Sequence, residues 1–335
     1  MKKIFLFAAL PALVLTGCSS DEILDTQKTA IEFNNVFVNK SSRAADLTAD
    51  NFGNCKIWGS SSTANAYIFN GTDLNVTNGS TVTYNPIQYW TANTSYYFMA
   101  IGSTTTESEN IAWSFEAPTA IPTAEGAFGT LSFDNVAAAG SVDIGYANAS
   151  RIQPATINDA AVSLNFKHAL SRTRFMFTNA MGVNYKIRVS NVVVSGTPAK
   201  GTLDFSNTDL TWSTEESTTV NYPFTGNKAN AFANGASSDT DRQFLLPSGT
   251  DFTVSFDVDL FITVDGSDVH VNGDTPYHHT VAITQDLAMG TAYLFKTTIG
   301  SENIDPDGSL KPITFTVEVA PWDTPIDVPA NIPNL

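Results

Sequence analysis

The stretch DFTVSFDVDLFITVD, residues 251–265, decides the fold class of this chain. Its even positions are all apolar from Phe252 to Val264, while most odd positions carry aspartate, serine or threonine. A period of two residues is typical of a β-strand with one buried face and one solvated face. Because a sheet with one apolar face must bury it against another layer, the stretch predicts packed sheets.

Similar alternation recurs at residues 185–190 and 293–299, and tight turns are expected between the strands. Asn-Gly or Asp-Gly pairs, which favour hairpin turns, stand at 70–71, 78–79, 265–266 and 272–273. We find no long amphipathic helix after the first 17 residues. The sequence therefore predicts an all-β chain with two antiparallel β-sandwich domains in tandem.

Length and composition fit two folded domains. The chain has 335 residues, of which 42% are hydrophobic and 22 are phenylalanine, so collagen, coiled coils and disorder are excluded. With 17 Lys+Arg against 33 Asp+Glu, its formal charge of −16 argues against nucleic acid as a partner. Periodicity is weak over 148–159 and restarts at 162–166, so we place the domain boundary near Ser150, between 44–150 and 151–322.

The N-terminus indicates export. Lys2 and Lys3 precede an apolar run from Ile4 to Leu15, and Leu15-Thr16-Gly17-Cys18 closes it. This anatomy predicts a lipoprotein signal peptide over 1–17 with the lipid on Cys18; an ordinary secretory peptide is the alternative. The acidic segment 19–22 resembles the export tag of surface lipoproteins in the Bacteroidia. With Cys18 lipidated, Cys55 has no intrachain disulfide partner, and we expect it to be a buried side chain.

Several segments, taken in order over most of the chain, resemble the fimbrillin-like pilins of the Bacteroidales, the subunits of type V pili. They are the lipobox, the apolar segment 31–38 followed by SRA at 42–44, YW at 89–90 before YYF at 96–98, LNFKHALS at 164–171, GTAY at 290–293, and Trp322. The resemblance implies transthyretin-like sandwiches, lipoprotein export, removal of the first strand by cleavage after an arginine, and polymerisation into adhesive surface fimbriae by strand exchange.

The N-terminal residues are compatible with that mechanism. Ile31, Phe33 and Phe37 line one face of an apolar strand inside a propeptide, 18–43. Cleavage between Arg43 and Ala44 would remove this strand and leave an apolar groove with unpaired backbone, which invites a strand from another chain. Two other arginines in loop-like stretches compete as cleavage sites, Arg151 and Arg242.

The C-terminal tail, 323–335, is the candidate donor strand. Apolar side chains occupy its even positions: Ile326, Val328, Ala330 and Ile332. Prolines 325, 329 and 333 stand at odd positions, so they remove N–H donors from one edge of such a strand and leave the other edge intact. Two alternatives remain open, namely a proline-rich disordered end and an edge strand of the tail's own domain.

We predict no catalytic, cofactor or metal site, and no enzymatic activity. His278 and His279 are adjacent, so on a strand they point to opposite faces and cannot chelate one metal. Residues 305–309 resemble a calcium loop but lack its closing glutamate, so they indicate a turn. A rival function is a surface lipoprotein that binds glycan on a platform of exposed aromatic residues: Trp58, Tyr89, Trp90 and Trp113.

The expected location is the outer membrane and the cell surface, within a fimbrium. The expected partners are other pilin subunits, the outer membrane through the lipid of the precursor, and an arginine-specific protease. A host or bacterial surface ligand is a further expected partner.

Overall fold

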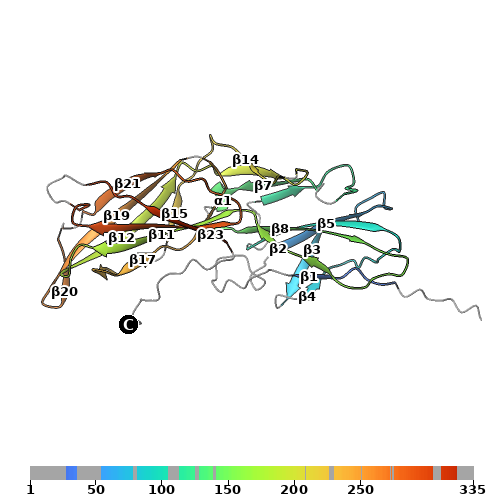
Figure 1. The fold of residues 1–335 in the computed structure, drawn as a ribbon, viewed down its shortest axis with the longest axis horizontal. Coiled ribbons are helices and arrows are strands. Elements are labelled where there is room, and N and C mark those ends of the chain that lie inside the picture. Colours follow the sequence, from blue (N-terminus) through green and yellow to red (C-terminus); the bar gives the residue numbers. More distant parts are fainter. Residues whose placement is uncertain are drawn as a thin grey trace, which may run out of the picture.

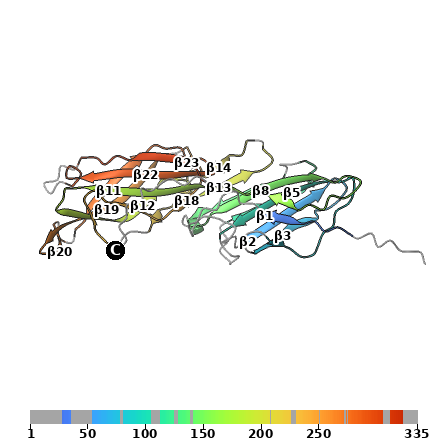
Figure 2. The same cartoon turned by 60° about the horizontal axis from the view of Figure 1, so that its bottom comes forward.

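The chain folds into an elongated molecule of two lobes that lie end to end along its long axis (Figure 1 and Figure 2). The computed structural model describes residues 28–35, 54–77, 81–104, 113–124, 128–138, 141–207, 209–225, 230–249, 251–271, 273, 275–304 and 311–322. Almost all regular structure in this part of the chain is β-strand, and the helix α1 (Asn135–Ala138) is short. The predicted all-β fold class is confirmed.

An eight-stranded sheet forms the lobe that we call the N-terminal lobe. Its strands, in spatial order, are β10 (Lys167–His168), β8 (Ile144–Ile152), β5 (Ser95–Ser103), β2 (Asn54–Ser61), β3 (Phe69–Thr77), β4 (Thr81–Thr83), β1 (Phe33–Asn35) and β9 (Val162–Leu164). The β1–β9 pair is parallel, and the other neighbours are antiparallel. The buried apolar side chains of this lobe, among them Phe69 and Phe98, form one core.

Two packed sheets form the C-terminal lobe. The first contains β17 (Ser237–Asp239), β11 (Ser171–Ala180), β22 (Thr291–Gly300) and β23 (Thr316–Pro321) in that order, with β18 (Gln243–Leu245) also paired to β11. The second contains β15 (Tyr222–Phe224), β12 (Tyr185–Ser195), β19 (Phe252–Val264) and β20 (Ser267–His270), with β16 (Phe232–Ala233) on β12 and β21 (Tyr277–Ile283) on β19. Their facing apolar side chains form a second core.

The stretch whose alternation predicted the fold class forms β19. From Phe252 to Val258 its even residues are buried and its odd residues are partly exposed, as the alternation required. The turn predicted at Asp265-Gly266 joins β19 to β20, and both residues have positive φ, 50° and 79°. Asn70-Gly71 lies inside β3 instead, where Gly71 (φ 69°) forms a bulge opposite β2.

A four-stranded sheet connects the lobes. It contains β14 (Trp212–Thr214), β13 (Lys200–Asp204), β7 (Thr130–Asp134) and β6 (Trp113–Glu116), so residues on both sides of the predicted domain boundary pair directly. A third core beneath it takes side chains from both sides, such as Phe133 and Leu203. Non-local strand pairing of this kind leaves no signal in local periodicity.

The predicted boundary near Ser150 therefore differs from the lobe division. Ser150 lies inside β8, and Val162, Leu164 and Phe166, which were expected to open the second domain, pack in the N-terminal core. The N-terminal lobe thus extends beyond the expected 44–150, and the C-terminal lobe begins later than 151. That each lobe is an independent transthyretin-like domain stays a prediction.

Candidate strand-exchange sites

The first strand occupies an interior position of the N-terminal sheet. Asn34 pairs with Thr81 of β4 on one side, while Phe33, Asn34 and Asn35 pair with Val162, Ser163 and Leu164 of β9 on the other. An interior strand satisfies the backbone of two neighbours at once. We call the position of residues 28–35 between these neighbours the β1 slot.

Main-chain hydrogen bonds hold the residues before β1 as well. The Ile31 amide donates to the Gln88 carbonyl at 2.8 Å, and the Trp90 amide donates to the Thr29 carbonyl at 2.9 Å. The Tyr84 hydroxyl donates to the Ile31 carbonyl at 2.6 Å. Burial raises the pKa of the Tyr84 phenol, so this hydroxyl stays protonated and able to donate. Residues 29–31 are therefore bonded to the segment 84–90 that follows β4, and Glu32 accepts a bond from the Val162 amide of β9.

Side chains of the same strand complete the N-terminal core. Ile31 and Phe33 are almost fully buried, with exposed fractions of 1% and 4%. The Phe33 ring meets three others edge-on, with centroid distances of 5.6 Å to Phe69, 5.8 Å to Tyr84 and 5.3 Å to Phe98. Loss of this strand would uncover an apolar trough lined by these rings, between the two unpaired edges of β4 and β9.

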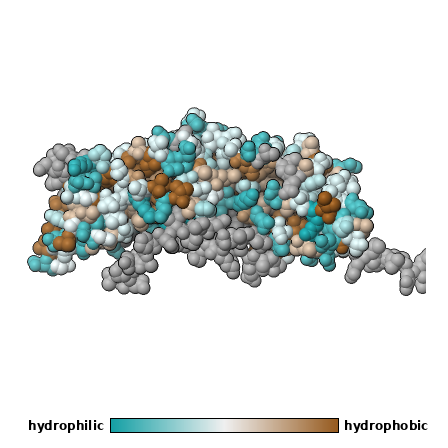
Figure 3. All heavy atoms as spheres, in the orientation of Figure 1, coloured by the Kyte–Doolittle hydropathy of each residue, from teal (hydrophilic) through white to brown (hydrophobic). Residues whose placement is uncertain are grey.

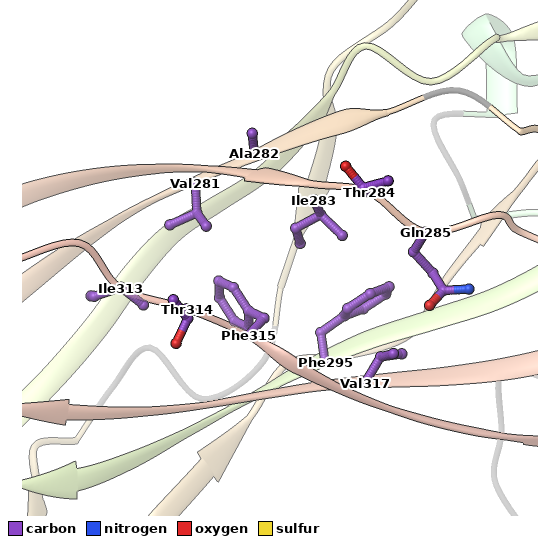
Figure 4. A pocket seen from close by; sticks show the side chains of 10 residues that line it. All are labelled: Val281, Ala282, Ile283, Thr284, Gln285, Phe295, Ile313, Thr314, Phe315 and Val317. Atoms are coloured by element: carbon purple, nitrogen blue, oxygen red, sulfur yellow. The ribbon is translucent and has the colours of Figure 1, made fainter.

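The C-terminal lobe has a groove of its own, which Figure 4 shows from close by. We call it the seam: a cavity of about 280 Å³ between residues 281–285, at the end of β21, and residues 313–317, which lead into β23. In Figure 4, Val281 and Ile283 point from one side toward Phe315 and Phe295 on the other. The seam lies where the two sheets of the sandwich stand apart at their edges.

The edge strand β23 is only partly covered. It pairs with β22 on one side, and no other strand of the described residues lies on its second side. Val317 and Val319 are 39% and 51% exposed. In the space-filling view of Figure 3, hydrophobic atoms gather over this part of the C-terminal lobe, between the places of β21 and β23 in Figure 1. Sequence reasoning missed this strand, although residues 313–319 alternate apolar and mostly polar side chains.

Trp322 fixes the point from which the tail leaves. Its indole stacks on the His168 imidazole (centroids 4.1 Å apart, planes 2° apart) and on the Phe244 ring at 5.5 Å. Arg172 packs its guanidinium over the indole at 5.4 Å and donates from Nη2 to the Trp322 carbonyl at 3.2 Å. The Trp322 amide donates to the Gly290 carbonyl at 3.0 Å. The last described residue is thus held by three strands and a turn.

Of the predicted site residues, the structure places Ile31 and Phe33 in the β1 slot. The others lie outside the described residues: Cys18, Phe37, Arg43, Ala44, Ile326, Val328, Ala330 and Ile332. Their roles in lipidation, cleavage and strand donation stay predictions. The competing arginine Arg151 lies in β8 rather than in a loop, and its guanidinium donates to the Ala160 and Ala161 carbonyls.

The aromatic platform required by the glycan-binding alternative is not formed. Trp58, Trp90 and Trp113 are buried, and only Tyr89 of the four is substantially exposed, at 45%. Trp58 of β2 and Trp113 of β6 belong to one core, and Trp90, which follows the isolated bridge at Tyr89, belongs to the N-terminal core. The alternative function therefore loses the observation on which it depended.

Candidate chemical sites are sparse in the described part of the chain. It contains no group of three or more His, Cys, Asp or Glu side chains that could hold a metal ion. His279 is buried against Phe256, while His278 faces the other side and pairs with Asp257 at 2.7 Å, which confirms their predicted divergence. Cys55 is buried, and burial, reinforced by the negative charge of Asp73, raises the pKa of its thiol. In the described part of the chain, no helix has the length and apolar content needed to cross a bilayer.

The chain is similar to known proteins in both sequence and structure. A family model described as fimbrillin-like matches residues 42–322. No curated protein matches the chain. A candidate cell adhesion protein from Bacteroides ovatus is similar in structure, with a TM-score of 0.50 and 13% identity over 88% of this chain and 98% of that one.

Two further solved structures align at lower scores. A candidate cell adhesion protein from Bacteroides uniformis has a TM-score of 0.47 and 15% identity, over 89% of this chain and 99% of that one. The fimbrial anchor protein Mfa2 from Porphyromonas gingivalis has a TM-score of 0.38 and 9% identity, over 88% and 96%. The Bacteroides ovatus structure shows a shared fold.

Proposed function

Because this chain belongs to the fimbrillin-like family, we propose that it is a pilin, a structural subunit of cell-surface fimbriae that supports adhesion. The observation that carries the proposal is the interior position of β1, whose apolar side chains complete the N-terminal core while it separates β4 from β9. A strand in that position can be exchanged for one of another subunit, because the pairing edges and the apolar trough are already formed. The proposed role is non-enzymatic and needs no cofactor.

Export as a lipoprotein is the first step of the proposed pathway. The signal peptide ends before Cys18, whose thiol carries the lipid, and the acidic residues after it direct the precursor to the outer membrane and the cell surface. This step rests on the sequence of the N-terminus, since residues 1–27 lie outside the described part.

Proteolysis after Arg43 is the second step. Arg43 stands between β1 and β2 in the chain, so a single cut by an arginine-specific protease separates the first strand from the rest of the domain. The precursor is held as a monomer because its own strand fills the β1 slot. Loss of that strand then permits a neighbour of the same or another pilin type to enter the slot.

The donated strand is proposed to be the tail, through Ile326, Val328, Ala330 and Ile332. Their side chains share one face of an extended strand, as the trough around Phe69, Tyr84 and Phe98 demands. Partners are therefore other pilin subunits, with a host or bacterial surface ligand as the target of adhesion.

A protease-triggered assembly assay tests the proposal. Purified precursor and its Arg43→Ala variant are incubated with an arginine-specific protease, and products are followed by light scattering, SDS-resistant ladders and electron microscopy. We expect filaments from the parent and from an Arg242→Ala control, and monomers from Arg43→Ala. Identical mass distributions before and after cleavage of the parent would show that the first strand does not block assembly.

A further inference from the structure

The eight-stranded sheet of the N-terminal lobe is almost closed on itself. β9 and β10 follow one another in the chain with only Asn165 and Phe166 between them. β9 pairs with β1 at one end of the strand order, whereas β10 pairs with β8 at the other end. One short segment, 162–168, therefore joins the two ends of the sheet, and β1 is the strand beside it.

Loss of β1 would leave β9 without a strand neighbour. Among the described residues, β9 pairs with no strand other than β1, and the Val162 amide donates to the Glu32 carbonyl at 2.7 Å. β4 is antiparallel to β1 and β9 is parallel to it, so β4 and β9 are antiparallel to each other. Their free edges would stand about 10 Å apart, which is two strand spacings. A shift of one spacing by β9 would pair these edges and close the β1 slot.

Arg151, in β8, holds the residues just before β9 from outside the slot. Its guanidinium donates from Nη1 to the Ala160 carbonyl and from Nη2 to the Ala161 carbonyl, the latter at 3.1 Å. The same group lies over the Trp90 ring, 5.4 Å from its centroid. A planar guanidinium that donates two bonds and stacks on a ring has a fixed orientation. The start of β9 is therefore tied to β8 by contacts that do not involve β1.

The connection from β8 to β9 is braced as well. Gln153 donates from Nε2 to the Asn158 carbonyl, and the Asn158 amide donates to Gln153 Oε1, both at 2.9 Å. The backbone of this connection is anchored to the residues before β5. The Gln153 amide donates to the Thr94 carbonyl at 2.9 Å, and the Asn93 amide donates to the Pro154 carbonyl at 3.2 Å. None of these bonds involves β1, so departure of the first strand removes none of them.

We propose that Arg151 is a positioning residue for the β1 slot, which keeps β9 two strand spacings from β4 after β1 has left. The inference rests on the proposed function, because it requires that β1 can be replaced. Loss of Ile31 and Phe33 uncovers apolar surface, and the tendency to bury that surface again favours closure of the slot. Arg151 opposes closure at the start of β9, and the β10–β8 pairing opposes it at the other end. The slot therefore stays open for the entering strand.

Uptake of a labelled peptide tests the proposal. The full precursor is cut with an arginine-specific protease and incubated with an excess of a fluorescent peptide of residues 28–35, and binding is followed by anisotropy. We expect the parent to take up the peptide and Arg151→Ala to bind it at least about tenfold more weakly, because bonds from a charged donor are lost. The matched control Lys56→Ala, which breaks an exposed ion pair with Asp73 in the same lobe, should bind like the parent. Equal uptake by Arg151→Ala and the parent would overturn the inference alone, whereas no uptake by the parent would overturn the proposed function with it.

The uncut precursor separates positioning from folding. Before cleavage β1 pairs with β9, so Arg151→Ala should keep the circular dichroism spectrum and the gel-filtration volume of the parent. If Arg151→Ala does not fold, Gln153→Ala takes its place, because it removes the neutral bonds of the same connection. That variant should bind the peptide about threefold more weakly than the parent. Parent-like uptake by a folded Gln153→Ala variant would then overturn the inference.

The width of the slot can be measured directly with spin labels. Thr83→Cys on β4 and Ser163→Cys on β9 place labels at two exposed positions, in a Cys18→Ala background, since Cys55 is buried. Their separation is determined by electron paramagnetic resonance before cleavage, and again after cleavage and removal of the released strand by gel filtration. It should stay constant in the parent and shorten by about 5 Å, one strand spacing, in Arg151→Ala. Shortening in the parent, or a constant separation in Arg151→Ala, would overturn the inference.

Discussion

Phe33→Ala in the precursor measures how firmly the first strand is held. The ring is 4% exposed and contacts Phe69, Tyr84 and Phe98 edge-on at 5.3–5.8 Å. Truncating a buried phenylalanine costs about 3–5 kcal/mol, because apolar burial is lost and a cavity remains. Each aromatic pair adds about 0.5–1.5 kcal/mol to its burial, so the upper half of that range is expected here.

Urea unfolding followed by tryptophan fluorescence provides the assay. With a slope of about 3 kcal/mol per molar urea, the midpoint should fall by about 1 M or more. Glu32→Ala is the matched control, since Glu32 lies next to Phe33 but its side chain is exposed. An exposed substitution of that kind should change the free energy of unfolding by no more than about 0.5 kcal/mol.

The two variants should also differ after cleavage at Arg43. A strand that has lost its ring leaves the slot sooner, so the Phe33→Ala precursor should polymerise faster than the parent once the protease is added. If Phe33→Ala is no more damaging than Glu32→Ala, the core does not hold β1. The slot would then not be the feature that keeps the precursor monomeric.

Three further changes have defined outcomes. Cys18→Ala should abolish incorporation of labelled palmitate, and labelling that persists would place the lipid elsewhere. Arg188→Ala should lower the free energy of unfolding by about 3–5 kcal/mol in chemical denaturation, because it leaves the buried Asp259 carboxylate without its partner at 2.8 Å. The control Lys186→Ala breaks an exposed ion pair and should lower it by at most about 1 kcal/mol. Burial lowers the pKa of His279 below its ordinary value, so the unfolded chain binds the proton more readily and the free energy of unfolding should fall as the pH drops below about 6.5. In thermal melts from pH 7.5 to 5, His279→Phe should remove that part of the decline, and an unchanged pH dependence would contradict this.

The alternation of apolar and polar residues predicted the strands well where one face of the strand is exposed to solvent along its whole length. In β19 the pattern holds to Val258 and then fails: Asp259 is buried, and so is Phe261, another odd residue. The Arg188 guanidinium covers its ring at 5.4 Å, and the His270 ring lies 4.1 Å away. The outer face of the sheet is covered there by side chains of neighbouring strands, which no reading of one strand can reveal.

Turn signals were correct only in part, for a physical reason. Asp265-Gly266 and Asn70-Gly71 carry the same chemistry, since both supply residues that tolerate positive φ. A hairpin and a bulge require that conformation equally. At Gly71 the chain continues in β3 and the residue is the extra one opposite β2, so the pairing of strands distant from the turn decides between the two.

The candidate site was predictable from the sequence at the first strand, where a short stretch already shows that Ile31 and Phe33 share an apolar face. The role of the tail stays a prediction. The seam and the sheet that joins the lobes depend on strands far apart in the chain, such as β7 and β13, and on which edges remain without a neighbour. Those relations arise only when the whole chain has folded.

The long antiparallel ladders β5–β8 and β12–β19 have a mechanical consequence. Both run close to the long axis of the molecule, one in each lobe (Figure 1). Their hydrogen bonds stand perpendicular to the strands, so tension applied between the two ends of the molecule loads each ladder in shear, with many bonds sharing the force at once. A cell tethered through such subunits would pull against this strong direction, while a sideways force would open the same ladders one bond at a time.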